Sequence, residues 1–510
     1  MKKYMKLNLI LGISSVFGFI LLLNILPKVG AIYTHDSVAY TYGAKSLLNG
    51  QGLKYFGYKT PIIQWPPLYS LLLVIPTAIG LEISRFVIFF NSFLFAFILF
   101  ISGKWFYEHL KSKMLVYLGV IFIMFSIPII HISRFIWTEP LFILLLITSL
   151  ICFEKYLEKY SMKWLIISGL ISSICWLTRY TGITVLITCC LLILIYRKSI
   201  KNKLIDLFIY GSLSAIPMAV WVIRNIILSN TITGGRTIKR TSIINNIKKT
   251  LHIFYSWFTG EEFRISIIGI ISLTLIVIIS IIILIMRKRS KEIIRGCNKG
   301  FIEFLIFSML YFIILIHSAS KYAMDPLNDR LWSPIYIPLI FVTFYIIDII
   351  VNNLIIDNKL LIRCFKISVY ISLIIIVSYQ IKYYISNRHS FHLCKIGTAY
   401  SEHVTNSETI HYINNNSFED DAIIFGNNPS ILTYHTDFDS RWTPKKNGIE
   451  IYGFDQFEQT IETSNNLYIA WFGDTNSNTF YTINDISKHY SVELVKKLSD
   501  GVIYRINSSN

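Results

Sequence analysis

Two acidic residues, Asp36 and Glu139, each lie just outside an apolar stretch of the sequence. The distribution of lysine and arginine along the chain places both on the same face of a membrane. Anchoring in lipid requires no carboxylate at either position. Two carboxylates on one face could deprotonate a hydroxyl group or hold a metal ion where a lipid-borne substrate arrives.

The segments that position these residues have the composition of membrane helices. Of the 510 residues, 54% are hydrophobic and only 15% are charged. Apolar runs such as Ile265–Met286 and Leu331–Val351 are long enough to cross a hydrocarbon layer of ~30 Å. Helices satisfy their own backbone hydrogen bonds in lipid. The predicted fold class is therefore an all-α polytopic membrane protein with a small extracytoplasmic α/β domain at the C-terminus.

The basic residues predict the orientation of the chain. The formal net charge is +18, and the lysines and arginines gather mainly in short loops between the apolar runs. This placement is the usual topology signal, so no nucleic-acid partner is predicted. With these loops and the N-terminus in the cytoplasm, about 11 spans are needed. They are residues 7–26, 84–104, 114–131, 138–156, 163–178, 181–196, 204–228, 265–286, 301–318, 331–351 and 364–384.

Two segments depart from this regular pattern. The apolar piece Leu68–Leu81 is short and contains Pro76, so it is predicted to be an interfacial or re-entrant helix. The loop Ser229–Arg264 falls on the outer side although it carries several basic residues. Either it attracts anionic groups there, or the scheme is locally wrong.

Two regions are expected outside the membrane. The first is the outer loop of residues 27–84, which belongs to the predicted transmembrane domain, residues 1–386. The second is the predicted C-terminal domain, residues 387–510. In the first loop, Asp36–Leu48 is predicted to be a helix with Thr34 as N-cap and Asn49-Gly50 as its stop. In the tail, one helix and three strands are predicted, at Ser407–Asn414, Ala422–Phe425, Leu467–Phe472 and Gly501–Ile506.

The first outer loop carries a recognisable motif. Asp36 is followed four residues later by Tyr40, then by a helix ending at Asn49-Gly50, and by Pro66-Pro67-Leu68-Tyr69 at the start of an apolar segment. This pattern resembles the GT-C superfamily of membrane glycosyltransferases, in particular the protein mannosyltransferases, the aminoarabinose transferases and the bacterial RgtA/B/C/D-like enzymes. Further pieces agree in order: Trp137–Pro140, Leu177–Tyr180, Trp221–Asn225 and Asp329–Pro334.

The resemblance implies roles for individual residues. The first-loop aspartate of the superfamily is a catalytic base or metal ligand, and Asp36 matches it. Glu139 matches the second acidic position, where many relatives have aspartate. Arg330 matches the arginine that faces the lipid phosphate, although Leu331 stands where relatives more often have tyrosine.

The residues themselves leave alternatives open. A guanidinium can hold a departing phosphate with paired hydrogen bonds, and Arg179, Arg224 and Arg330 all fall on the outer side. Each arginine could instead be an interface anchor. Asp36 and Glu139 could simply stabilise helix starts. Tyr40 and Tyr69 could stack on sugar rings or belong to an interfacial aromatic belt. His35 could be a metal ligand or a histidine of the loop.

The predicted function is transfer of a sugar from a polyprenyl-phosphate donor, with inversion, to an acceptor on the extracytoplasmic face of the cell membrane. The predicted acceptor is a glycan, a lipid or a protein, and membrane lipids surround the enzyme. No cofactor is predicted with certainty, and a divalent metal ion is the one candidate. The alternative is a transporter or flippase of lipid-linked saccharides, which should carry charges near the middle of its spans. The clear spans lack acidic residues at their midpoints, which favours the enzyme. A non-catalytic membrane sensor would not need the motif around Asp36.

Overall fold

The computed structural model describes residues 2–259, 298–353, 359–392, 406–446, 453–473 and 479–507, apart from Val29, Tyr58, Thr237, Ser417 and Asp437. Contacts divide the chain into two compact units. The first, here called the membrane unit, comprises Met1–Leu26, Ile88–Ile223 and Lys239–Phe391. The second, the loop–tail unit, comprises Pro27–Val87, Arg224–Ile238 and His392–Asn510.

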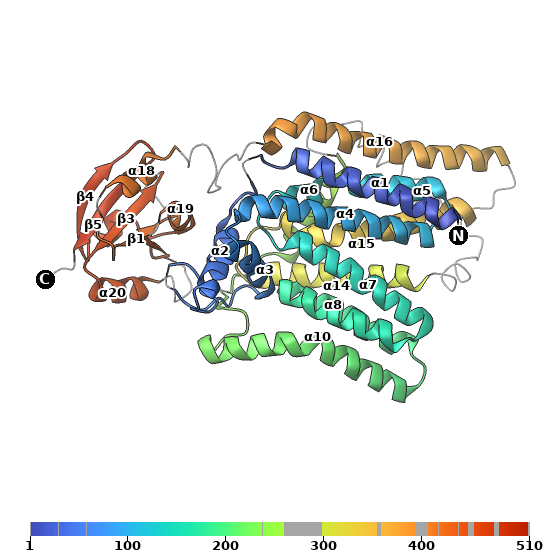
Figure 1. The fold of residues 1–510 in the computed structure, drawn as a ribbon, viewed down its shortest axis with the longest axis horizontal. Coiled ribbons are helices and arrows are strands. Elements are labelled where there is room, and N and C mark those ends of the chain that lie inside the picture. Colours follow the sequence, from blue (N-terminus) through green and yellow to red (C-terminus); the bar gives the residue numbers. More distant parts are fainter. Residues whose placement is uncertain are drawn as a thin grey trace. The chain divides into compact units, whose positions relative to one another are not determined.

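Long apolar helices lie side by side in the membrane unit (Figure 1). Eight stretches of the described residues are long and apolar enough to cross a membrane, and three further apolar helices are shorter. The helices of this unit are α1 (Lys2–Ile25), α4 (Ile83–His109), α5 (Lys113–Met124), α6 (Ile127–Ser133), α7 (Glu139–Lys159), α8 (Met162–Thr178), α9 (Ile183–Tyr196), α10 (Ile200–Ser229), α11 (Ile243–Thr259), α14 (Lys299–Lys321), α15 (Asp329–Asn353) and α16 (Lys359–His392), together with the 3-10 turn η1 (Tyr180–Gly182). The predicted polytopic helical fold is confirmed.

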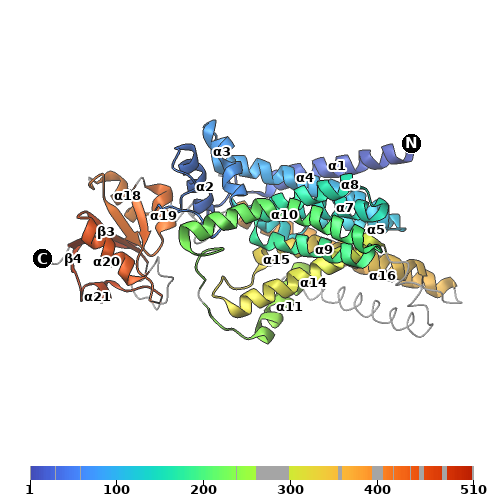
Figure 2. The ribbon, with the colours of Figure 1, turned by 90° about the horizontal axis from the view of Figure 1, so that it is seen from below.

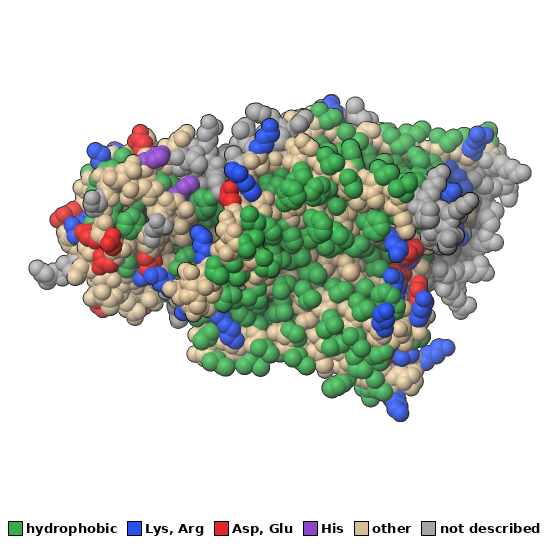
Figure 3. Space-filling model, in the orientation of Figure 1, with side chains coloured by type: hydrophobic (Ala, Val, Ile, Leu, Met, Phe, Trp, Pro, Cys, Tyr) green, Lys and Arg blue, Asp and Glu red, His purple; other side chains and the backbone are tan. Residues whose placement is uncertain are grey.

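Ten of the 11 predicted spans coincide with helices or helix pairs, and the span 265–286 lies outside the described residues. One predicted span, 114–131, is broken between α5 and α6. Ser126 caps the second piece by accepting a hydrogen bond from the backbone N–H of Ile129 at 3.2 Å, and Pro128 stands in its first turn. Hydrophobic side chains cover the visible flank of the helices (Figure 3). Among the large apolar side chains of these helices, Phe89 and Ile195 are each 61% exposed, which suits a lipid environment.

The first loop forms two helices, α2 (His35–Leu48) and α3 (Leu68–Ala78). The predicted cap of α2 is present, because Thr34 Oγ1 accepts from the Ser37 N–H and lies 3.0 Å from Ser37 Oγ. The predicted stop is present too, since Asn49 caps the C-terminus and Gly50 adopts φ of +75°, a conformation that suits glycine. The short apolar piece around Pro76 is helical, as predicted.

The tail forms a five-stranded mixed sheet in the order β2-β1-β3-β5-β4. Its strands are β1 (Ile423–Gly426), β2 (Asp439–Trp442), β3 (Leu467–Phe472), β4 (Ser491–Lys497) and β5 (Gly501–Asn507), and its helices are α18 (Glu408–Asn415), α19 (Pro429–His435), α20 (Phe454–Thr463) and α21 (Ile483–Ile486). β1 pairs in parallel with β2 and β3, whereas β5 runs antiparallel to β3 and β4. The predicted helix and strands are present, and β2 and β4, the two edge strands, were not predicted.

Candidate functional site

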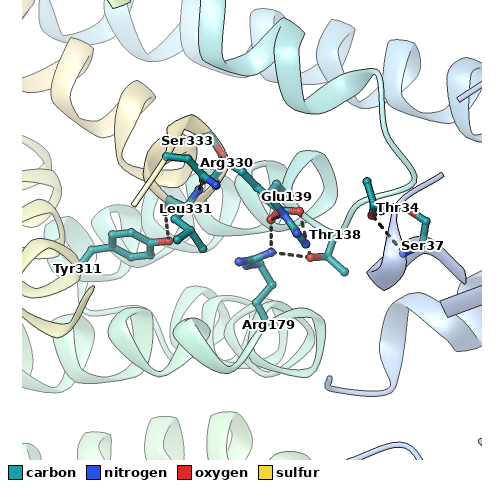
Figure 4. Close-up of polar contacts among 10 residues, drawn as sticks. Thr34, Ser37, Thr138, Glu139, Arg179, Tyr311, Arg330, Leu331 and Ser333 are labelled. Carbon is teal, nitrogen blue, oxygen red and sulfur yellow. Dashed lines mark hydrogen bonds and ion pairs between the residues drawn. The ribbon is translucent and has the colours of Figure 1, made fainter. Parts of the chain in front are cut away.

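A fully buried carboxylate, that of Glu139, forms the centre of the site in the membrane unit. Arg330 Nε donates to Glu139 Oε1 at 2.6 Å, and Arg179 Nη1 forms a second ion pair with the same oxygen. Figure 4 shows the carboxylate between the two guanidinium groups. Three helix ends therefore meet at one charged cluster: the start of α7, the start of α15 and the end of α8.

Local sequence explains the position of Arg179. Helix α8 ends at Thr178, and Arg179 has an extended backbone with φ of −148° and ψ of 138°. The chain then turns tightly through η1, where a Cβ added to Gly182 would meet Trp176 Cα at 2.5 Å. Only glycine fits so close to that backbone. The break turns the arginine side chain to α7, where Nη1 also donates to Thr138 Oγ1 at 2.9 Å.

Arg330 is held by the first turn of α15 and by an aromatic ring. Asn328 Oδ1 accepts from the Leu331 N–H at 3.1 Å, which caps the helix start. Ser333 and Tyr311 bond the carbonyl oxygens of Arg330 and Leu331 at 2.8 and 2.9 Å (Figure 4). The guanidinium carbon lies 4.2 Å from the centroid of the Trp137 ring, a cation–π contact.

The charges of the cluster leave a positive surplus. Two guanidinium groups and one carboxylate sum to one positive charge, and the arginine side chains are only 13–14% exposed. Arg179 Nε is buried and has no hydrogen-bond partner in the part of the chain that the structure describes. A buried donor without an acceptor is costly. The cluster is therefore suited to take an additional anion, such as a phosphate group.

The other predicted site residues lie in the loop–tail unit. Asp36 is half-buried in the first turn of α2. Arg224 Nη1 donates to the Ile62 carbonyl at 2.9 Å and to Asn225 Oδ1 at 3.0 Å, so this guanidinium fastens the first loop. Tyr40 and Tyr69 are 2% and 0% exposed, and their rings pack edge to face at 5.2 Å. Their contact with a sugar stays a prediction, as does phosphate binding by Arg224.

His35 is engaged by aromatic residues of both the first loop and the tail. Its Nε2 lies 2.7 Å from the hydroxyl oxygen of Tyr55, and its ring lies 5.2 Å from Phe56 and 5.3 Å from Trp442. Burial lowers the pKa of His35 to about 4, the neighbouring Asp36 opposes that shift, and Lys445 adds to it. No group of three His, Cys, Asp or Glu side chains among the described residues is arranged to hold a metal ion, and a metal requirement stays untested.

An apolar cavity of about 250 Å³ lies in the membrane unit. Residues of α5, α11, α15 and α16 line it, among them Phe122, Trp257, Tyr336, Ile340, Phe344 and Leu373. Trp257 Nε1 donates to Asp329 Oδ1 at 2.7 Å, directly before Arg330 in the sequence. Helix α15 thus carries Arg330 in its first turn and lines the cavity from Tyr336 onward. Sequence reasoning did not single out Trp257, although the aromatic spacing of Phe254, Trp257 and Phe258 was a signal that could have marked it.

Comparisons with known proteins identify a matching family and similar folds. The family described as dolichyl-phosphate-mannose-protein mannosyltransferase matches residues 64–221. No curated protein matches the chain in sequence. Among solved structures, ArnT from Cupriavidus metallidurans in the apo state has a TM-score of 0.57 at 9% identity, covering 98% of this chain and 97% of that one. The same enzyme bound to undecaprenyl phosphate gives 0.57 at 10% identity, with the same coverage.

A third similar structure is arabinofuranosyltransferase AftD from Mycobacteria, with a TM-score of 0.56 at 10% identity. The match covers 98% of this chain and 40% of AftD. ArnT and AftD are members of the GT-C superfamily. The chain is a multi-pass membrane protein with the GT-C fold. The resemblance to the GT-C superfamily that the motifs indicated is thereby confirmed.

Proposed function

We propose that this protein is an integral-membrane glycosyltransferase that takes a sugar from a polyprenyl-phosphate donor. The observation that carries the proposal is the buried cluster of Arg179, Glu139 and Arg330, with its surplus positive charge and its unpartnered Nε. The matching family is named for a dolichyl-phosphate-mannose donor, and ArnT was solved with undecaprenyl phosphate bound. Both names point to the same chemical class of donor.

The leaving group of this reaction explains the cluster. When the bond between the anomeric carbon and the phosphate oxygen breaks, the electron pair stays on the phosphate, whose negative charge grows. Two preorganised guanidinium groups in a water-poor site favour that charge far more than water-exposed ones would. Glu139 holds both guanidinium groups in place and is itself too well compensated to be an effective base. We therefore assign it a positioning role.

The base is Asp36 in this proposal. The acceptor hydroxyl oxygen attacks the anomeric carbon on the face opposite the phosphate, and its proton passes to the Asp36 carboxylate. A positioned base of this kind contributes about 10²–10⁴-fold to the rate. One displacement inverts the anomeric centre. The first-turn position in α2 suits a carboxylate, because a helix N-terminus favours negative charge.

The apolar cavity that Trp257 helps to line holds part of the polyprenyl chain in this proposal. Its lining is almost entirely aromatic and aliphatic, and it adjoins the helix turn that carries Arg330. A tail in this cavity and a phosphate at the cluster would both contact helix α15. The reaction takes place on the extracytoplasmic face, where nucleotide sugars are absent, and the acceptor is a glycan, a lipid or a protein.

The test is release of polyprenyl phosphate by the purified protein. The protein is incubated in nanodiscs with radiolabelled polyprenyl-phosphate sugars and a cell-envelope extract as acceptor source, and the released lipid phosphate is separated and counted. Wild type should release it, whereas Arg179→Gln should not. The matched control is Arg363→Gln, which alters an exposed arginine at the start of α16. Transbilayer movement of the donor without release would support the flippase alternative and contradict the proposal.

A further inference from the structure

The first turns of helix α11 (Ile243–Thr259) are inverted with respect to an ordinary surface helix, whereas Trp257 near its end is buried. Large apolar side chains face outward: Ile243, Ile244 and Leu251 are 57%, 65% and 59% exposed. Polar side chains face inward: Asn246 and Thr250 are 8% and 0% exposed. At 100° per residue, the exposed apolar positions share one arc of the helix, and Lys248 and Lys249 lie on the next arc. Such a helix suits the boundary between hydrocarbon and water.

The buried polar side chains fix α11 against the end of α14 (Figure 2). Asn246 Nδ2 donates to Ser320 Oγ at 2.9 Å and to Thr241 Oγ1 at 3.1 Å. The backbone N–H groups of Lys239 and Thr241 donate to the carbonyls of Lys321 and Ser320 at 3.1 and 3.0 Å. The helix is therefore held where a membrane-spanning helix ends, with its apolar arc facing outward.

The same surface is strongly basic. Five exposed cations lie on α11, on the segment before it and at the end of α14: Lys239, Arg240, Lys248, Lys249 and Lys321. None of the five forms an ion pair within the described ranges of the chain, and residues 229–259 contain no Asp or Glu. In sequence, the next acids are Glu261 and Glu262 after this stretch, and Asp325 lies exposed in the loop after α14. A basic rim beside an apolar arc matches the chemistry of an anionic lipid headgroup on its acyl chain.

We propose that α11 and the segment Lys239–Arg240 form a docking surface for anionic glycerophospholipids of the leaflet at this end of the spans. The apolar arc enters the acyl region, and the lysine and arginine side chains reach the headgroup phosphates. This surface explains why a basic segment lies at the end of the spans where the positive-inside pattern does not expect one. The inference stands whether or not the protein transfers a sugar.

The experiment measures lipid preference of the full-length protein. Detergent-solubilised protein is titrated with equal amounts of phosphatidylglycerol and phosphatidylcholine, and the retained lipids are counted by native mass spectrometry. We expect enrichment of phosphatidylglycerol on wild type. In Lys248→Gln/Lys249→Gln the enrichment should fall by about fivefold for each charge removed, the equivalent of ~1 kcal/mol per basic residue near a charged surface.

A matched control separates the surface from general charge. The double variant Lys496→Gln/Lys497→Gln removes two exposed lysines from β4 in the tail and should leave the enrichment unchanged. In wild type, added salt should weaken the enrichment. The proposal is overturned if Lys248→Gln/Lys249→Gln retains wild-type enrichment or if the control loses as much. It is also overturned if inorganic phosphate displaces the lipid, because the surface would then recognise a free anion rather than a leaflet.

Discussion

Replacement of Arg330 by lysine tests the phosphate assignment most directly. The guanidinium donates from Nε to Glu139 Oε1 at 2.6 Å, and its central carbon lies 4.2 Å from the centroid of the Trp137 ring. These two contacts fix the position of a planar, forked donor group. Lysine keeps the positive charge but presents a flexible point charge in place of the fork. A phosphate held by two parallel hydrogen bonds would therefore lose at least one of them in Arg330→Lys.

The expected magnitude follows from that loss. A hydrogen bond to a charged group is worth about 1.5–3 kcal/mol, and each 1.4 kcal/mol is about tenfold in an equilibrium constant or rate. We expect kcat/KM for the donor to fall by about 10- to 100-fold in Arg330→Lys. Arg330→Ala should fall further, because it also leaves the buried Glu139 with one counter-charge, and breaking a buried ion pair costs about 3–5 kcal/mol.

The assay is steady-state sugar transfer against donor concentration, with membrane levels of each variant matched by immunoblot. Arg363→Lys, an exposed arginine at the start of α16, is the control and should behave as wild type. If Arg330 is only an interface anchor, lysine should substitute freely, because both side chains snorkel. Equal activity of wild type and Arg330→Lys would refute the reasoning and would move the phosphate role to Arg179 or Arg224, or remove it.

Three further predictions follow from the same geometry. Asp36→Asn should abolish transfer while expression and membrane insertion stay intact, since it keeps size and removes basicity; transfer near the wild-type rate would make Asp36 a helix-start residue only. Glu139→Gln should lower thermal stability, because two buried guanidinium groups lose their counter-charge at a cost of about 3–5 kcal/mol. Added polyprenyl phosphate should raise the unfolding temperature of this variant more than that of wild type. An undiminished unfolding temperature of Glu139→Gln would contradict the prediction. His35 has a pKa lowered to about 4, so the folded protein keeps it neutral where the unfolded chain, below about pH 6.5, binds a proton. The stability of the folded protein should therefore decline as the pH falls from 6.5 towards 4. Thermal unfolding of His35→Gln across that range should show a smaller decline.

The local features of the fold could be read from the sequence because each depends on nearby residues. Hydrophobic run length located the spans, and the cap and stop of α2 were set by Thr34, Asn49 and Gly50. The central strands β1 and β3 are buried and apolar, so they were predicted. The edge strands β2 and β4 were missed, because an edge strand is half-solvated and tolerates residues such as Asp439 and Lys497.

The sequence identified the residues of the candidate cluster but not the contacts between them. Glu139, Arg179 and Arg330 each carried a motif, but the bond between Glu139 and Arg330 joins residues 191 positions apart. Such a contact depends on how α7, α8 and α15 pack, and no local pattern encodes that packing. The inverted character of α11 was hidden for a related reason. Its apolar and basic residues are visible in the sequence, but which arc is buried depends on Ser320 at the end of α14.

The surroundings of Glu139 favour a positioning role over that of a base. A base must offer a lone pair to a hydroxyl proton, and Glu139 has no exposed surface and shares its Oε1 between two guanidinium groups. Taking up a proton there would break two charge-assisted bonds in a buried site, which is costly. Asp36 is half-buried in the first turn of α2, outside the spans. In our proposal, one carboxylate orders the groups that receive the departing phosphate, and the other accepts the proton of the attacking hydroxyl.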